Sequence, residues 1–106
     1  MQRSERVDGL VGAQLDAAVA RAERSGLSFD LRGEPPACYV DGTPYAPSSN
    51  WSHGGPITER ERVLVAPKRS EWRALCGPWC VTGPTPLVAA MRAYVVSQCG
   101  ETVELP

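Results

Sequence analysis

Residues 85–100, with the sequence TPLVAAMRAYVVSQCG, decide the fold that the chain is expected to adopt. Thr85 and Pro86 favour a helix start, because the threonine hydroxyl can accept from free backbone amides and proline loses no needed donor at the first helical position. One apolar face then repeats at helical spacing, made of Leu87, Ala90, Met91, Tyr94 and Val95. Gly100 can end the helix. We therefore expect a helix from Pro86 to Cys99.

A second helix is expected near the N-terminus, from Leu10 to Arg24. Its apolar residues also fall at helical spacing, alanines fill the positions between them, and Gly26 can act as the C-cap. These apolar residues are Val11, Leu15, Ala18, Val19 and Ala22. Residues 1–8 carry several charged side chains, so we expect a disordered N-terminus over 1–8 and one domain over 9–106.

The remaining segments favour short strands separated by turns. Leu27–Arg32 and Ala37–Asp41 are expected to pair as an antiparallel hairpin. The other candidate strands are Arg62–Ala66, Glu71–Leu75, Cys80–Thr82 and an edge strand at Glu101–Pro106. The sequence therefore predicts a single α+β domain with a mostly antiparallel sheet of about four to five strands and two helices, near Leu10–Arg24 and Pro86–Cys99.

Size, composition and charge exclude several classes of protein. A chain of 106 residues fits one domain, and 42% hydrophobic with 22% charged residues is far from the composition of disordered chains. A net charge of -1 supplies no overall basic field for phosphates, so strong nucleic-acid binding is not expected. The same net charge still allows a local basic patch. No apolar stretch at the N-terminus suits a signal peptide or membrane span, which predicts a cytoplasmic protein without membrane contact.

The four cysteines, Cys38, Cys76, Cys80 and Cys99, are expected to be free thiols in a chain without an export signal. Cys76 and Cys80 are one residue too far apart for a thioredoxin-type redox site. Even with Cys38, Cys99 or His53 nearby, one loose pair is a poor match for structural zinc, which usually has two tightly spaced ligand pairs. We therefore expect neither a metal nor a cofactor.

The segment from Thr43 to Pro56 is rich in proline, serine and glycine and is expected to be a loop. In and just after it lie two aromatic rings for stacking, a Gly-Gly pair that lets backbone amides approach a ligand, and arginines that can bind phosphate or carboxylate. Such a cluster can hold a nucleotide-like molecule. The candidate ligand-binding residues are Tyr45, Ser48, Asn50, Trp51, His53, Gly54, Gly55, Arg60 and Arg62.

Each of these features also has a purely structural interpretation. Tyr45 and Trp51 could simply pin a long loop onto the sheet. Glu59–Arg62 alternates in sign, and in a strand this pattern would give a solvated edge with weak ion pairs. His53 lies close to several serines, but a loop histidine that makes turn hydrogen bonds is a better interpretation than a catalytic base. No convincing catalytic set is present, so no enzyme activity is expected.

Residues 45–61, YAPSSNWSHGGPITERE, resemble the characteristic segment of the phage NinX family, found in phages and prophages. Gly12–Glu23 and Gly83–Val95 are similar to the first and last helices of that family. The chain departs from the family pattern at Asn50, where Asp is usual, and at Ser52–His53, where Ala-Gln is common, which weakens a catalytic role for His53. The resemblance implies a phage accessory protein in a family without a settled biochemical activity.

Three functions are compatible with these observations. The first is a non-enzymatic binding protein, a homo-oligomer in the host cytoplasm that sequesters a small polar or nucleotide-derived ligand, such as a bacterial immune signal, and so counters a defence system. The second is a regulatory factor that binds a host protein through Trp72, Trp79 and the last helix. The third is a small enzyme that uses His53, Glu59 or a cysteine. The sequence favours the first.

Overall fold

The computed structural model describes residues 3–23 and 27–105. This part of the chain forms three α-helices and eight short strands, which confirms the α+β class. The helices are α1 (Gly12–Ala22), α2 (Trp51–Arg60) and α3 (Pro86–Cys99), with a short 3-10 helix η1 (Val7–Gly9). The strands are β1 (Arg3–Arg6), β2 (Phe29–Arg32), β3 (Ala37–Val40), β4 (Thr43–Pro44), β5 (Leu64–Lys68), β6 (Glu71–Cys76), β7 (Trp79–Gly83) and β8 (Thr102–Leu105).

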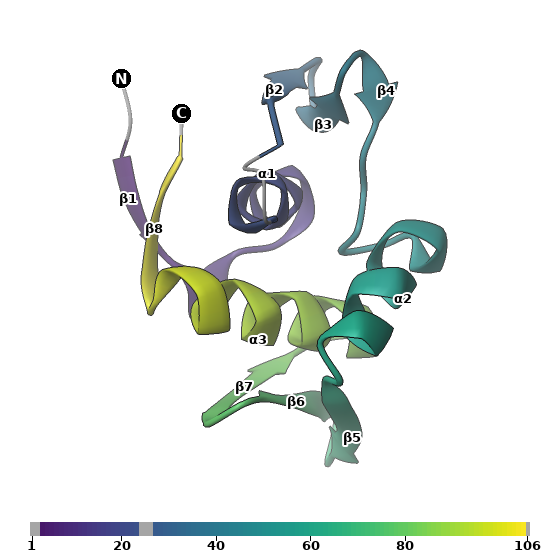
Figure 1. The fold of residues 1–106 in the computed structure, drawn as a ribbon, viewed down its shortest axis with the longest axis vertical. Coiled ribbons are helices and arrows are strands. Elements are labelled where there is room, and N and C mark those ends of the chain that lie inside the picture. The colour runs from purple at the N-terminus through teal and green to yellow at the C-terminus, as the bar shows by residue number, and fades with distance from the viewer. Residues whose placement is uncertain (1–2, 24–26, 106) are drawn as a thin grey trace.

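The strands pair antiparallel, as expected, but in the described residues they form three small sheets instead of one. The strand orders are β1-β8, β2-β3-β4 and β5-β6-β7. Helix α3 lies between α1 and the β5-β6-β7 sheet, and β2, β3 and β4 lie on the far side of α1 (Figure 1). Because α1 and α3 stand between the two three-stranded sheets, backbone hydrogen bonds cannot join those two sheets into one.

Helix α3 is the centre of the fold. Every residue from Leu87 to Val96 is buried, and the helix contacts α1, α2 and the β5-β6-β7 sheet. The Thr85 hydroxyl accepts from the Val88 amide at 3.1 Å, and Gly100 ends the helix with a positive φ of 86°. The predicted bounds and both end residues are therefore confirmed. The burial differs from the prediction, since it extends around the helix instead of along one apolar face.

Arg92 is the charged residue inside this buried helix, and it is 8% exposed. Its Nε donates to the Leu10 carbonyl and its Nη1 donates to the Thr82 carbonyl, both at 2.9 Å. Burial lowers the pKa of Arg92, although a guanidinium keeps its charge in proteins. Arg92 therefore ties the segment before α1 and the end of β7 to the central helix.

The N-terminal residues differ from the expectation of disorder. Residues 3–8 form β1 and part of η1, whereas Met1 and Gln2 lie outside the described residues. Strand β1 pairs with the expected C-terminal strand, β8, with Glu5 opposite Val103. Val103 and Leu105 are buried, so β8 is anchored by its apolar side chains and gives β1 a partner. Helix α1 lies within the predicted range, and Gly26, the predicted cap, lies outside the described residues.

The predicted hairpin of β2 and β3 is confirmed, with Phe29 opposite Val40. Strands β5 and β6 form another hairpin, in which Lys68 lies opposite Glu71. The prediction placed the first of these strands at Arg62–Ala66, but the strand is Leu64–Lys68. The shift arises because Arg62 and Val63 belong to the end of the helix that precedes it.

Helix α2 is the largest departure from the sequence prediction, which had a loop over Thr43–Pro56. The Asn50 side chain caps the helix, since its Oδ1 accepts from the Ser52 amide at 2.8 Å. Pro56 lies inside the helix, where it removes one backbone donor. Glycine and proline both lower helix propensity, so contacts with the rest of the fold must stabilise α2.

Candidate functional site

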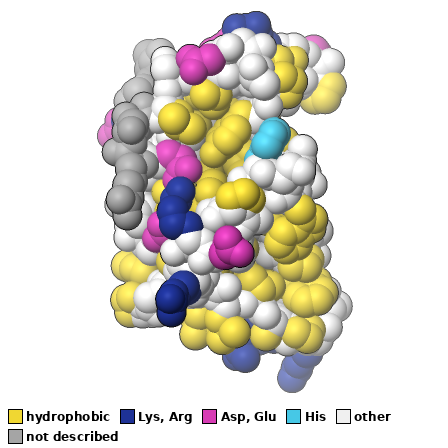
Figure 2. Space-filling view, turned by 45° about the vertical axis from the view of Figure 1, so that its right-hand side comes forward, with side chains coloured by type: hydrophobic (Ala, Val, Ile, Leu, Met, Phe, Trp, Pro, Cys, Tyr) yellow, Lys and Arg dark blue, Asp and Glu magenta, His cyan; other side chains and the backbone are white. Residues whose placement is uncertain are grey.

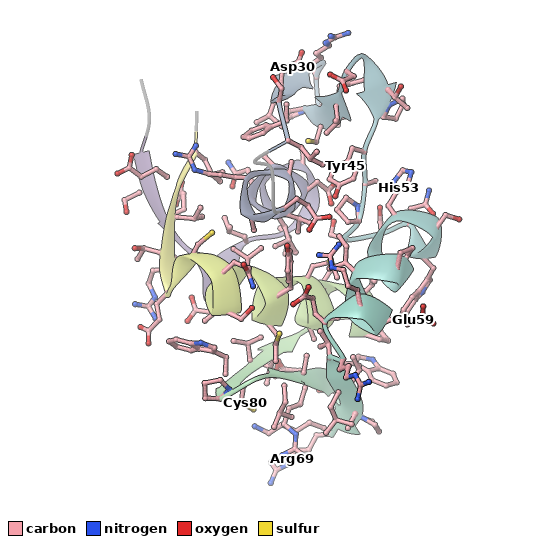
Figure 3. The ribbon with its side chains drawn as sticks, viewed as in Figure 1. Asp30, Tyr45, His53, Glu59, Arg69 and Cys80 are labelled. Atoms are coloured by element: carbon pink, nitrogen blue, oxygen red, sulfur yellow. The ribbon has the colours of Figure 1, made fainter. Side chains whose placement is uncertain are left out.

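Tyr45 and His53 hold the turn before α2 against the first turn of that helix. Their rings stack, with centroids 5.6 Å apart and planes at 22°, and Figure 3 shows the two side chains next to each other. The Ala46 amide donates to His53 Nδ1 at 3.0 Å. Tyr45 is half-buried, and burial raises the pKa of its hydroxyl. His53 therefore makes a turn hydrogen bond, and Tyr45 is an anchor.

Ser48 is buried and is held by a carboxylate that sequence reasoning missed. Its amide donates to Asp16 Oδ1 at 2.8 Å, and its hydroxyl lies 3.5 Å from the Gly12 carbonyl. Asp16 is 5% exposed, and burial raises its pKa despite the hydrogen bond from Ser48. The one sequence feature that could have revealed it is a lone Asp within the alanine-rich stretch of the first helix.

Gly54 and Gly55 have different roles. A Cβ at Gly54 would lie 2.3 Å from the Pro47 carbonyl oxygen and 2.7 Å from Leu87 Cδ1. At Gly55 a Cβ would meet only Trp51 Cε3, at an ordinary 3.8 Å. Gly54 is therefore needed for close packing of α2 against the preceding turn and α3, so its backbone is not exposed to a ligand.

Arg60 belongs to a network that joins all three helices. Its Nη2 lies 2.7 Å from Glu23 Oε2, and its Nε donates to Glu61 Oε2 at 2.8 Å. The buried Tyr94 hydroxyl donates to the same Glu23 oxygen, and the Arg60 guanidinium lies over the Tyr94 ring. Arg60 is thus engaged at the end of α1 and the side of α3, although its side chain is 41% exposed.

Arg62 forms the end of α2 and has a left-handed φ of 54°. Its amide donates to the Glu59 carbonyl at 3.2 Å, and the Val63 amide donates to the Thr58 carbonyl at 3.0 Å. These two bonds form a Schellman motif. The strand interpretation of the alternating charges at Glu59–Arg62 is therefore wrong, because these residues end a helix.

The candidate residues do not converge on one point. Trp51 and Arg60 are nine positions apart on α2, which places them about 13 Å apart along the axis and about half a turn apart around it. Trp51 therefore faces a different part of the surface from Arg60. The structure separates the predicted cluster into anchors, helix ends and one exposed aromatic side chain.

An open groove of about 380 Å³ lies beside Trp51. It brings together the first residues of all three helices: Gly12 of α1, Trp51 of α2 and Pro86 of α3. The other lining residues are Ser48, Ser49, Thr85, Leu87 and Val88. Of the predicted site residues, the groove thus unites Ser48 and Trp51. The part of the groove formed by the start of α3 was indicated in the sequence by the helix start at Thr85–Pro86.

The cysteines and the other two tryptophans lie elsewhere. Cys76 is buried and Cys80 is exposed, and because Cys76 pairs with Trp79 while Cys80 pairs with Leu75, the two thiols project from opposite faces of the sheet. All four cysteines are free, and the described residues contain no group of three metal-binding side chains. Trp72 and Trp79 are half-buried against the core, and α3 is buried from Leu87 to Val96, so they do not form the exposed surface that was expected to bind a host protein.

A second hollow, of about 160 Å³, lies between β7 and the N-terminal segment. Within it, Arg6 pairs with Asp8 at 3.2 Å and approaches Glu101 at 3.9 Å. The single positive charge of this hollow is therefore shared between two carboxylates, and its lining keeps a net charge of -1.

The chain matches a known family over most of its length. The family model described as Bacteriophage P22, NinX matches residues 6–98, which include α1, α2 and both three-stranded sheets. There is no significant match among curated proteins. Within the described ranges, no helix has the length and hydropathy needed to cross a membrane. Because the match covers far more than half of its residues, this chain belongs to the NinX family of bacteriophage P22.

Proposed function

We propose that this NinX-family protein is a non-enzymatic phage accessory protein that binds a small nucleotide-like ligand in the groove beside Trp51. The observation that carries the proposal is the exposure of Trp51, which is 56% exposed at the wall of that groove. Large aromatic side chains are mostly buried in proteins. A flat ring beside an open groove suits the stacking of a nucleobase.

Backbone amides supply the polar complement to this ring. The first amides of a helix have no acceptor within the helix, and the positive end of the helix dipole favours an anion there. Three helices begin at the groove, and α1 has no side-chain cap. The lining contains hydroxyl groups but no lysine or arginine. This composition favours a ligand with one phosphate or carboxylate over a polyphosphate, whose further charges would find no basic partner.

The engagement of the polar side chains supports binding without turnover. Ser48 is buried, and its hydroxyl donates to the Gly12 carbonyl at 3.5 Å. His53 uses Nδ1 to accept from a backbone amide. Neither side chain is poised as a nucleophile or a base beside the groove. Membership of a phage family supports a role in the infected cell, and we propose sequestration of a nucleotide-derived immune signal in the host cytoplasm.

Calorimetry and thermal-shift measurements with a panel of ligands test this proposal. The panel contains nucleosides, mononucleotides, cyclic mononucleotides and dinucleotides, and ADP-ribose derivatives. We expect at least one member to bind with a Kd below about 100 μM. Trp51→Ala should weaken that binding about tenfold or more, because stacking on an aromatic ring contributes about 1–3 kcal/mol per base.

Leu64→Ala is the matched control, because Leu64 is a large apolar side chain that is 60% exposed and does not line the groove. It should change the Kd by less than about twofold, as expected for a surface substitution away from the site. The proposal fails if no panel member binds at about 1 mM, or if the two substitutions weaken binding equally.

A further inference from the structure

The basic side chains of the protein are unevenly distributed. Arg6, Arg32 and Arg60 form ion pairs with carboxylates, and Arg92 is buried. Among the residues whose side chains the structure describes, the exposed basic ones without an ion pair are Arg21, Arg62, Lys68, Arg69 and Arg73.

All of these unpaired basic side chains except Arg21 come from residues 62–73. That segment contains four basic residues and a single carboxylate, Glu71, and so has a surplus of three positive charges in a chain whose net charge is -1. Local charge of this kind attracts anionic groups even when the whole molecule does not.

Lys68, Glu71 and Arg73 of this segment lie on the outer face of the β5-β6-β7 sheet. Helix α3 packs on the inner face, where Val65, Trp72 and Trp79 contact the core. Side chains alternate along each strand, so the opposite face carries Leu64, Ala66, Lys68, Glu71, Arg73, Leu75, Cys80 and Thr82. Figure 1 places this sheet at the lower end of the molecule, Figure 2 shows basic side chains at that end, and Figure 3 places Arg69 there.

An apolar row crosses this outer face. Leu64, Leu75 and Cys80 are direct neighbours across the three strands, and Leu64 is 60% exposed. Arg73 lies in the adjacent row, and Arg62 precedes Leu64 along the chain. Arg73 therefore borders the apolar row on one side, and Arg62 lies two residues before Leu64 at the start of β5.

The free edge of β5 is poorly suited to adding a strand from a partner. Lys68 and Glu71 close a two-residue turn as a hydrogen-bonded pair, so the backbone groups of Val65 and Pro67 point to the free edge. Pro67 has no N–H to donate. A partner would therefore dock on the face of the sheet more readily than it would extend the sheet at β5.

We propose that the outer face of the β5-β6-β7 sheet docks an acidic segment of a partner protein, in which carboxylates alternate with leucine-sized side chains. The carboxylates pair with the basic side chains around Leu64 and Leu75, and the apolar side chains cover these two leucines. A nucleic acid fits this face less well, because Trp72 and Trp79 face the core and leave no aromatic ring on which bases could stack. The surface shares no residue with the groove beside Trp51.

Fluorescence anisotropy at low salt, with a labelled peptide of Glu-Glu-Leu repeats and the full chain, tests the docking surface. Peptides of Gln-Gln-Leu and Glu-Glu-Ser repeats and a single-stranded DNA of equal charge serve as comparisons. The Glu-Glu-Leu peptide should bind about tenfold more tightly than each of these, because it alone supplies both the charge and the apolar contact.

Arg73→Glu should weaken binding of the Glu-Glu-Leu peptide about tenfold. Arg21→Glu, which makes the same change in net charge at an exposed arginine of α1, should weaken it less than about twofold. Leu64→Ser should remove the preference for Glu-Glu-Leu over Glu-Glu-Ser, whereas Trp51→Ala should leave it unchanged. Absence of binding, equal effects of Arg73→Glu and Arg21→Glu, or tighter binding of the DNA would overturn the proposal.

Discussion

Asp16 shows how one buried carboxylate can position the wall of a surface groove. It accepts from the amide of Ser48, and Ser48 lines the groove beside Trp51. We expect Asp16→Asn to keep this hydrogen bond through its amide oxygen and to be at least as stable as the wild type at pH 7. Asp16→Ala should lose about 1–3 kcal/mol, because it leaves the buried Ser48 amide without an acceptor.

The raised pKa of Asp16 gives this prediction a pH dependence with a definite sign. The folded state holds the Asp16 proton to higher pH than the unfolded chain does. The resulting stability is therefore present at low pH and is lost as the pH rises through the raised pKa. Relative to the wild type, the stability of Asp16→Asn should increase between about pH 4 and pH 7. Urea unfolding of both proteins at the two pH values measures this stability difference. A difference that stays constant or shrinks as the pH rises contradicts the prediction.

Gly54 and Gly55 offer a matched pair of substitutions. Gly54→Ala should lose about 1–3 kcal/mol, because its Cβ would overlap the Pro47 carbonyl oxygen and force packing shifts. Gly55→Ala should gain about 0.5–1 kcal/mol, since alanine favours a helix and has room there. Thermal and urea unfolding measure both. Equal stabilities of the two variants would mean that α2 is not held against Pro47.

At the scale of the element, α2 is stabilised by its two ends. At its start, Asn50 caps the helix and His53 accepts from the Ala46 amide. At its end, Arg60 binds Glu23, and the bond from Arg62 belongs to the closing Schellman motif. These contacts offset the low helix propensity of its glycines and proline.

The left-handed conformation of Arg62 allows a test of whether the C-terminal end of α2 limits stability. A residue with a Cβ loses about 1–2 kcal/mol in this conformation, and glycine does not. Arg62→Gly should therefore raise the free energy of unfolding by about 1 kcal/mol. Arg62→Ala removes the same side chain without relieving the backbone and should have little effect. Urea unfolding compares the two, and equal values would show that the Schellman motif does not limit stability.

At the scale of the whole molecule, α3 separates two surfaces with different chemistry. The groove beside Trp51 is built from helix starts and has no charged side chain in its lining. The outer face of the β5-β6-β7 sheet combines an apolar row with unpaired basic side chains. Because the two surfaces share no residue, substitutions at Trp51 and at Arg73 can be separated experimentally.

The local sequence by itself determined the elements whose ends are set by neighbouring residues in the chain. Thr85, Pro86 and Gly100 mark the ends of α3, and the turns after Arg32 and after Lys68 separate strands that pair with their neighbours in the chain. The motif at residues 45–61 also identified the family, which the match over residues 6–98 confirmed.

Only the tertiary structure decided that the segment around Trp51 is a helix, that β8 pairs with β1, and which of the candidate residues meet at a groove. The reason is the distance along the chain between the groups involved. Ser48 meets a carboxylate 32 positions away and Arg60 meets one 37 positions away. Patterns of spacing and propensity report only on neighbouring residues, whereas these contacts exist only after α1, α2 and α3 have packed together.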